Sequence, residues 1–230
     1  MQGEDGVRHV IMGPNGAGKT TLLDAITGAV RPASGSISLG DQRIDLLPVA
    51  ARVQAGIVRT FQSPRVFPSL SVLENIWIGA NRRDAAYRFW VGWRGNGLAV
   101  SEAQEAASHL GLEELQGRMA SQLSYGQRRM LEIAMAYASK PRLLLLDEPT
   151  AGLSRPERDR VIESLIRLSK RCPVVAIEHD LDIVVEFANW ITVLHRGCLL
   201  REGPPAAIIQ DEAVVAAYLG GEEVPHGAQS

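Results

Sequence analysis

One eight-residue segment constrains the fold of this chain more than any other part of its 230 residues. It has the pattern Gly-x-x-x-x-Gly-Lys-Thr and consists of Gly13, Pro14, Asn15, Gly16, Ala17, Gly18, Lys19 and Thr20. A short apolar run, residues 9–12, precedes it, and apolar residues recur at helical spacing over residues 19–29. A strand, a glycine-rich loop and a helix in this order indicate a P-loop, which binds phosphate groups.

The residue types of this loop suit a nucleotide. Glycines allow successive backbone N–H groups to turn inward around an anion, and the helix that follows adds the positive end of its dipole. Lys19 supplies a mobile charge for the β- and γ-phosphates, and the Thr20 hydroxyl is placed to bind Mg²⁺. We assign Thr21 to the same site. The alternative is an ordinary glycine-rich turn that happens to precede a lysine.

Two carboxylates follow the apolar run 143–146, which reads as a strand buried on both faces. The carboxyl ends of parallel strands open into the ligand crevice, so Asp147 and Glu148 are expected to face the phosphates. Asp147 would hold Mg²⁺, and Glu148 would act as the general base or orient the attacking water. The alternative is a pair of acids that cap the next segment.

Strands and helices alternate along most of the chain, which predicts an α/β fold, a P-loop NTPase with a mainly parallel sheet. Further strands are expected at 36–39, 43–46, 56–60, 174–177, 191–194 and 198–201. Ser154 and Glu157 form a capping box for a helix, and residues 212–219 form another. We expect one domain, with residues 1–70 and 140–230 as the nucleotide-binding core and about 71–139 as a helical subdomain.

The amino-acid composition of the chain excludes several other classes of protein. Lys and Arg number 24 against 26 Asp and Glu, so there is no basic excess typical of a nucleic-acid-binding protein. The longest apolar run is residues 213–219, far below the roughly 18 residues that cross a bilayer. The start of the sequence has no signal-peptide pattern, and two distant cysteines suggest neither a metal cluster nor a disulfide framework. We therefore expect a reducing, cytosolic setting.

Residues 123–127, Leu-Ser-Tyr-Gly-Gln, narrow the class further. They resemble the signature Leu-Ser-Gly-Gly-Gln of the ATP-binding subunits of ABC transporters. The P-loop, Gln62, this segment, Asp147-Glu148, Ser154 and His179 also follow one another in that family's order. The resemblance covers nearly the whole chain and implies an ATPase that uses ATP and Mg²⁺.

In this family two ATPase subunits pair head to tail, and each ATP lies between one P-loop and the other subunit's signature. The resemblance therefore places Ser124, Gly126 and Gln127 against the ATP of a partner chain. Tyr125 departs from the usual glycine, and we expect its side chain to point away from the nucleotide. Ser124 is equally suited to be a plain N-cap of the helix that follows, and the two roles are compatible.

Three further residues acquire roles only through the resemblance. Gln62 matches a glutamine that contacts Mg²⁺ or the attacking water, and His179 matches a histidine that hydrogen-bonds the γ-phosphate. Ser154 stands where many relatives have Asp or Asn, and helix capping accounts for it equally well. The catalytic set is therefore Lys19, Gln62, Glu148 and His179, and Thr20, Gln62 and Asp147 form the metal set. Taken alone, Gln62 would be called a surface residue and His179 a structural one.

Segments 58–62, 65–68, 72–75, 127–134 and 214–220 resemble the importers of branched-chain amino acids, and importers of urea and short amides share much of this pattern. That branch implies a second ABC ATPase subunit, two membrane permease subunits and, indirectly, an extracytoplasmic solute-binding protein. It also implies a peripheral position on the cytoplasmic face of the cell membrane, with no nucleic acid bound. An ABC ATPase acting on nucleic acid or ribosomes and a regulatory subunit with little hydrolysis are the alternatives.

Seven of the twelve aromatic residues fall between positions 61 and 93: Phe61, Phe67, Trp77, Tyr87, Phe89, Trp90 and Trp93. Burial in the helical subdomain is the default explanation. The alternative is an apolar groove for a partner helix, in which we place Arg65, Val66 and Phe67.

Only twelve residues precede Gly13, and none is aromatic. Family members have about two more strands there and an aromatic residue that stacks on adenine. We therefore expect the small antiparallel β portion to be truncated on its N-terminal side. The alternative is a chain that naturally lacks the stacking residue and binds ATP with little grip on the base. Stacking on a base contributes about 1–3 kcal/mol, so ATP affinity should be lower by about tenfold or more.

Overall fold

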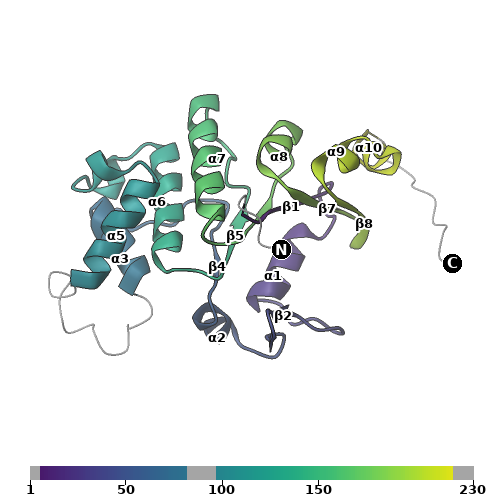
Figure 1. Cartoon of the computed structure of the whole chain (residues 1–230), viewed down its shortest axis with the longest axis horizontal. Coiled ribbons are helices and arrows are strands. Elements are labelled where there is room, and N and C mark those ends of the chain that lie inside the picture. Colours follow the sequence, from purple (N-terminus) through teal and green to yellow (C-terminus); the bar gives the residue numbers. More distant parts are fainter. Residues whose placement is uncertain (1–5, 82–96, 220–230) are drawn as a thin grey trace.

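The computed structural model describes residues 6–81 and 97–219, and within them the chain forms a six-stranded sheet in the order β4-β5-β6-β1-β7-β8 (Figure 1). The strands are β1 (Arg8–Met12), β4 (Ile57–Arg59), β5 (Leu143–Asp147), β6 (Val174–Ile177), β7 (Trp190–His195) and β8 (Cys198–Gly203). Neighbouring strands are parallel except β7 and β8, which form an antiparallel pair. The expected α/β fold with a mainly parallel sheet is confirmed.

A separate two-stranded antiparallel sheet joins β2 (Ser38–Leu39) to β3 (Gln42–Arg43). This is the hairpin expected around residues 40–41, but its strands are shorter than the sequence indicates. Leu46, expected in the second strand, lies outside it and is exposed.

Helices surround the large sheet. They are α1 (Lys19–Thr27), α2 (Val49–Gln54), α3 (Val72–Ala80), α5 (Gly97–His109), α6 (Tyr125–Ala138), α7 (Arg155–Ser169), α8 (Leu181–Phe187), α9 (Pro205–Ile209) and α10 (Glu212–Leu219), with short 3₁₀ turns at Glu113–Leu115 and Ala120–Gln122. The first helix ends two residues before the expected Ala29 because Gly28 adopts a left-handed conformation and its N–H bonds to Asp24. The expected capping box of Ser154 and Glu157 opens α7.

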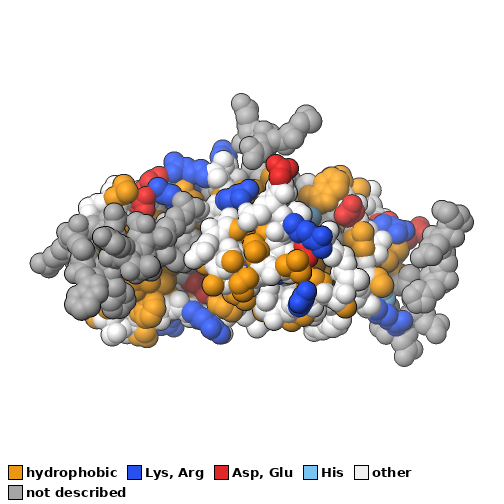
Figure 2. Space-filling model, turned by 90° about the horizontal axis from the view of Figure 1, so that it is seen from below, with side chains coloured by type: hydrophobic (Ala, Val, Ile, Leu, Met, Phe, Trp, Pro, Cys, Tyr) orange, Lys and Arg blue, Asp and Glu red, His pale blue; other side chains and the backbone are white. Residues whose placement is uncertain are grey.

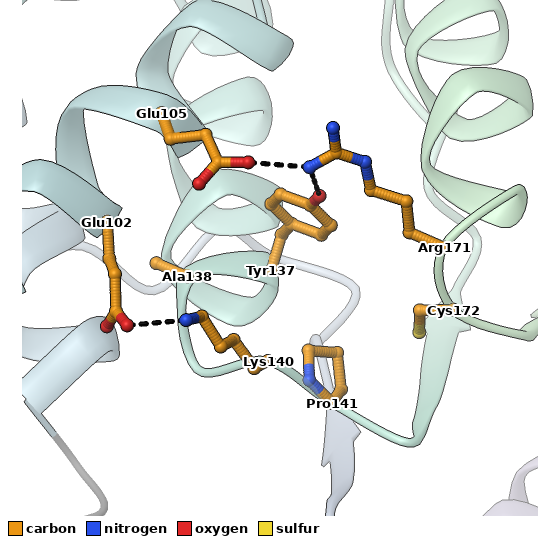
Figure 3. A pocket seen from close by; sticks show the side chains of 8 residues that line it. All are labelled: Glu102, Glu105, Tyr137, Ala138, Lys140, Pro141, Arg171 and Cys172. Atoms are coloured by element: carbon orange, nitrogen blue, oxygen red, sulfur yellow. Dashed lines mark hydrogen bonds and ion pairs between the residues drawn. The ribbon is translucent and has the colours of Figure 1, made fainter.

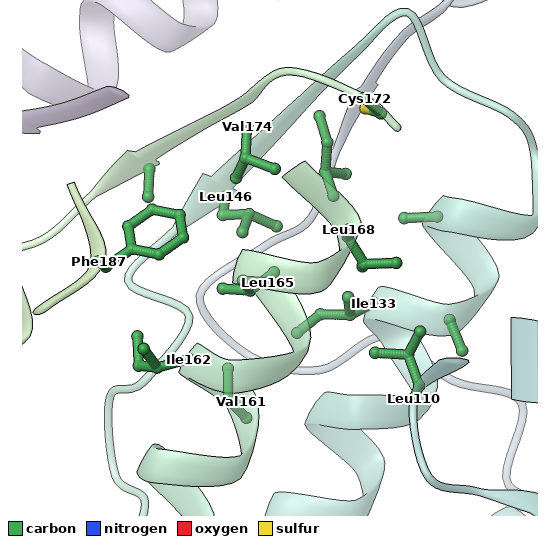
Figure 4. Close-up of a cluster of buried hydrophobic side chains, with 14 of the residues drawn as sticks. Leu110, Ile133, Leu146, Val161, Ile162, Leu165, Leu168, Cys172, Val174 and Phe187 are labelled. Carbon is green, nitrogen blue, oxygen red and sulfur yellow. The ribbon is translucent and has the colours of Figure 1, made fainter. Parts of the chain in front are cut away.

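The strand β5 is buried on both faces, as its continuous leucines indicate. Leu144 and Leu146 point to the side covered by α6, α7 and α8, where Phe187 and Leu165 pack (Figure 4). Leu145 points to the opposite side, into a smaller cluster with residues of α1 and β4. Because successive side chains of a strand alternate, one strand supplies both cores and fixes the sheet between its two helical layers.

The helices α3, α5 and α6 pack together at one end of the molecule (Figure 1). The helices α3 and α6 approach so closely that a Cβ at Gly79 would lie 2.1 Å from the carbonyl oxygen of Met135. Ser71 caps α3 by accepting a hydrogen bond from the backbone N–H of Glu74. Close contact between backbones, rather than large side chains, therefore sets the spacing of these two helices.

Polar contacts join this helical group to the turn after α7 (Figure 3). Arg171 donates to Glu105 of α5 at 2.6 Å and to the hydroxyl of Tyr137 at 3.1 Å. Lys140 pairs with Glu102 at 2.5 Å, and these side chains border a cavity of about 240 Å³. The pair of Arg171 and Glu105 is exposed to solvent on both sides and contributes little to stability, and the Lys140 ammonium of the second pair is also exposed.

Gly79→Ala tests the close approach of α3 and α6. The new methyl group has no room against Met135, so we expect the free energy of unfolding to fall by about 1–3 kcal/mol, measured by chemical denaturation. Gly117→Ala is the matched control because a Cβ there meets nothing within 4 Å. Equal stability of the two variants would contradict the packing described.

Candidate functional site

The P-loop wraps around the side chain of its own lysine. The Lys19 ammonium donates to the carbonyl oxygens of Gly13 at 2.7 Å and Pro14 at 3.0 Å. A Cβ at Gly13 would lie 2.1 Å from the carbonyl oxygen of Leu194, so only glycine fits where the loop leaves β1 and passes β7. Burial lowers the pKa of Lys19, and the negative charges of Glu148 and Asp147 act against that shift. The predicted lysine and carboxylates therefore lie within electrostatic reach of one another.

The start of α1 is open to solvent beside this lysine. Asn15, Gly16, Thr20 and Thr21 are exposed, whereas Ala17 is buried and its carbonyl accepts a hydrogen bond from the N–H of Gly197. Gly18 precedes the first residue of α1. The arrangement leaves backbone N–H groups and two hydroxyl groups available at a helix N-terminus, which favours an anion.

Asp147 ends β5 and is held by an arginine that the sequence analysis did not single out. Arg59, the last residue of β4, donates to Asp147 Oδ2 at 2.8 Å and forms a second ion pair with Asp24 of α1. One guanidinium thus fixes the carboxylate at the edge of the sheet and ties it to the helix after the P-loop. The role of Arg59 follows only from the order of the strands in the sheet, because that order places the end of β4 next to β5.

The Glu148 carboxylate lies next to both Gln62 and His179, the other two residues expected at this site. Its Oε2 accepts a hydrogen bond from Gln62 Nε2 at 3.1 Å, and its Oε1 lies 3.6 Å from His179 Nδ1. Glu148 itself has a φ of 46°, in the left-handed region that a residue with a side chain rarely adopts. Its backbone N–H bonds to the carbonyl of Ile177, which anchors this conformation to β6.

Glu178, a buried carboxylate between these loops, was also not predicted as part of the site. Glu178 is buried at the end of β6 and accepts hydrogen bonds from the Thr150 hydroxyl at 2.6 Å and the Thr150 N–H at 3.3 Å. Burial raises the pKa of Glu178, and the bonds from Thr150 oppose that shift. The contact connects the segment after Glu148 to the residue before His179.

The signature segment forms the start of α6. Ser124 Oγ accepts from the N–H of Gln127 at 3.2 Å, and Gln127 Oε1 accepts from the N–H of Ser124 at 2.9 Å, so the expected N-cap is present. A Cβ at Gly126 would lie 2.4 Å from Glu157 Oε1 of α7. The Tyr125 ring faces Gly152, in the loop that follows β5.

The donor set also suits a hard cation. Across 6–81 and 97–219, no three His, Cys, Asp or Glu side chains are grouped to hold a metal ion. Thr20, Gln62 and Asp147 offer hydroxyl, amide and carboxylate oxygens instead, and Mg²⁺ is usually held by a few such groups together with substrate phosphates. The residues therefore fit Mg²⁺ bound as a nucleotide complex.

A P-loop beside strand-end carboxylates and a capped Leu-Ser-Tyr-Gly-Gln helix defines a nucleotide-hydrolysing cassette. The family model "ABC transporter" matches residues 1–151, and the chain belongs to that family. It is an ATPase that binds and hydrolyses ATP. A second model, "Branched-chain amino acid ATP-binding cassette transporter", matches residues 202–224.

Named relatives are similar over most of their length. The high-affinity branched-chain amino acid transport ATP-binding protein BraF of Pseudomonas aeruginosa is 37% identical over 91% of this chain and 86% of its own. LivG of Escherichia coli, with the same description, is 36% identical over the same shares. The crystal structure of the ADP conformation of an ATP-binding cassette of an ABC transporter is similar with a TM-score of 0.81 and 31% identity, covering 94% of this chain and 88% of the other.

Arg59→Met tests the link between Asp147 and α1. Loss of the guanidinium leaves two carboxylates, Asp147 and Asp24, close together without their cation, so we expect kcat/KM for ATP to fall at least tenfold in a steady-state phosphate-release assay. Arg43→Met is the control, because among the residues described Arg43 pairs with Asp45 alone, beside the β2-β3 hairpin and away from Asp147. Similar activities of both variants would show that Arg59 has no part in the site.

Proposed function

We propose that this chain is the ATP-hydrolysing subunit that powers import of branched-chain amino acids through a membrane permease. The observation that carries the proposal is the meeting of Gln62 and His179 at Glu148, beside Lys19. These residues come from four separate segments and converge where the carboxyl ends of parallel strands open.

Each side chain has a defined task in this proposal. Lys19 and the P-loop N–H groups bind the β- and γ-phosphates, and His179 donates to the γ-phosphate. Glu148 accepts a proton from water as the water oxygen bonds to the γ-phosphorus and the bond to the departing ADP oxygen breaks. Gln62 holds the Glu148 carboxylate in place through its amide.

Thr20, Gln62 and Asp147 would hold Mg²⁺. When bound, the ion neutralises negative charge on the phosphates. Arg59 keeps the Asp147 carboxylate at the edge of the sheet, where it is available for this purpose.

The signature residues are proposed to act on a second cassette, identical or different. Ser124, Gly126 and Gln127 lie at the N-terminus of the fourteen-residue helix α6, where N–H groups and the helix dipole favour the γ-phosphate of a partner's ATP. Residues 71–139 are then the proposed helical signature subdomain, and 1–70 with 140–230 form the proposed core.

The segment after Gln62 supports a permease contact. Phe61 and Phe67 are 41% and 48% exposed, contrary to the default expectation that these aromatic residues are buried, and the Arg65 guanidinium lies 4.0 Å from the centre of the Phe61 ring. Tyr87, Phe89, Trp90 and Trp93 lie outside the described residues. We place one helix of a permease subunit on Arg65, Val66 and Phe67. The complete assembly then has two permease subunits, with the solute-binding protein beyond them.

The face of the molecule drawn in Figure 2 gives no support to a nucleic-acid partner. On the face drawn in Figure 2, Lys and Arg side chains are interspersed with apolar side chains, without a continuous basic stripe among the residues described there. Of the helices described, none is long and apolar enough to pass through a bilayer. We propose a peripheral position on the cytoplasmic face of the membrane, held by the permease.

Glu148→Gln tests the catalytic assignment. The amide keeps the shape of the side chain but cannot accept a proton, so we expect kcat to fall by at least 100-fold while ATP still binds, measured by phosphate release and fluorescent-nucleotide titration. Glu163→Gln, at an exposed position of α7, is the control. A loss of less than twofold in Glu148→Gln would exclude Glu148 as the base.

The substrate class rests on the names of the relatives and on the match of residues 202–224. In vesicles that contain the chain with the permease subunits encoded beside it, we expect ATP-dependent uptake of leucine and none of urea. Uptake of urea alone would assign the chain to the amide importers instead.

Phe67→Asp tests the permease surface. A carboxylate in an apolar contact lacks a partner, so we expect the variant to lose most of its membrane association in flotation assays while it retains ATP binding. Wild-type membrane association of the variant would place the contact elsewhere.

A further inference from the structure

A buried ion pair in α6 does not belong to any of the assigned motifs. Arg129 and Glu132 are 0% and 6% exposed and lie one helical turn apart. Arg129 Nη1 donates to Glu132 Oε2 at 2.8 Å. Charged residues are rarely buried to this degree unless they are paired.

Both members of the pair hold the same loop. Arg129 Nη1 donates to the carbonyl of Phe61 at 2.6 Å, and Arg129 Nη2 donates to the carbonyl of Gln62. Glu132 Oε1 accepts from the N–H of Phe61 at 3.3 Å and from the N–H of Arg65 at 3.2 Å. The backbone on both sides of Gln62 is therefore clamped by donors and acceptors of a single helix.

A gain in the stability of the fold alone does not explain why this buried ion pair is present. The cost of removing two charges from water offsets much of their attraction, and apolar side chains of similar volume often do as well. Planar guanidinium and carboxylate groups, however, fix the direction of each hydrogen bond, which apolar packing does not. The distinctive contribution of the pair is thus the position of the loop, whose Gln62 side chain donates to Glu148.

We propose that Arg129 and Glu132 are positioning residues that make the Gln62 loop move with α6. This inference rests on the proposed function, because α6 begins at the residues assigned to a partner's ATP. A displacement of the start of α6 is then transmitted through the clamp to Gln62 and from there to Glu148. The signature of one subunit and the catalytic carboxylate of the same subunit are mechanically connected in this way.

Arg129→Lys keeps the charge but loses the fork that contacts two carbonyls and Glu132. Glu132→Gln keeps one acceptor oxygen but leaves Arg129 without its counter-charge. For both variants of the full chain we expect kcat to fall at least tenfold with the KM for ATP changed less than threefold, since the P-loop is untouched. Arg128→Lys is the matched control on the same helix, because within the described part of the chain the Arg128 side chain donates to the carbonyl of Leu123 and not to the Gln62 loop. We expect its kcat to stay within twofold of wild type.

A double variant distinguishes positioning of Gln62 from a general effect. If Arg129 acts through Gln62, Arg129→Lys combined with Gln62→Ala loses no more kcat than Gln62→Ala alone. Losses that multiply would overturn the proposal. So would unchanged kcat in both Arg129→Lys and Glu132→Gln.

Hydrogen exchange keeps the test valid if a variant is poorly stable or inactive. We expect the amides of Phe61 and Arg65 to be protected in the wild type and to exchange at least tenfold faster in Glu132→Gln, while amides of β5 keep their protection. Uniformly faster exchange throughout the chain would indicate a purely structural role and overturn the proposal. Failure of the proposed function would give a different result from failure of this inference. The wild type would then lack ATPase activity that depends on Glu148. The exchange pattern is measured without ATP, so it tests the inference separately.

Discussion

The nucleotide site depends on the register of three parallel strands. Ile177 of β6 pairs with Ile11 of β1 on one side and with Asp147 of β5 on the other. Strands in this register end at the same level, so the P-loop, Glu148 and His179 leave the sheet beside one another. The hydrogen bond from the Glu148 N–H to Ile177 extends this alignment and holds a backbone conformation that costs about 1–3 kcal/mol.

Charged side chains then connect the loops that carry the chemistry. Arg59 joins Asp147 to α1, Glu178 joins the loop after Glu148 to the end of β6, and the pair in α6 holds the Gln62 loop. Each of these contacts links two elements that bear proposed catalytic or binding groups. The site therefore consists of loops fixed to a rigid sheet and to one another, which suits an enzyme that must align several groups on one phosphate.

The sequence predicts the parts of this structure that depend on local patterns. The P-loop, the buried strand β5, the N-cap of α6 and the capping box of α7 are predicted because their residues are neighbours in the chain. The short helices α2, α8 and α9 are not predicted, because their five to seven residues give too little hydrophobic periodicity. The roles of Arg59 and Arg129 are not predicted, for another reason. Asp147 lies 88 positions from Arg59 and Gln62 lies 67 positions from Arg129, and only the fold brings these residues together.

The central claim is that Lys19, Glu148 and His179 converge on one γ-phosphate, as their common position at the strand ends implies. A crystal structure of the Glu148→Gln chain with ATP and Mg²⁺ tests this most directly. The account predicts the γ-phosphate within hydrogen-bond distance of Lys19 Nζ and His179, with residue 148 next to the water in line for attack. ATP bound with its γ-phosphate away from these side chains would contradict it.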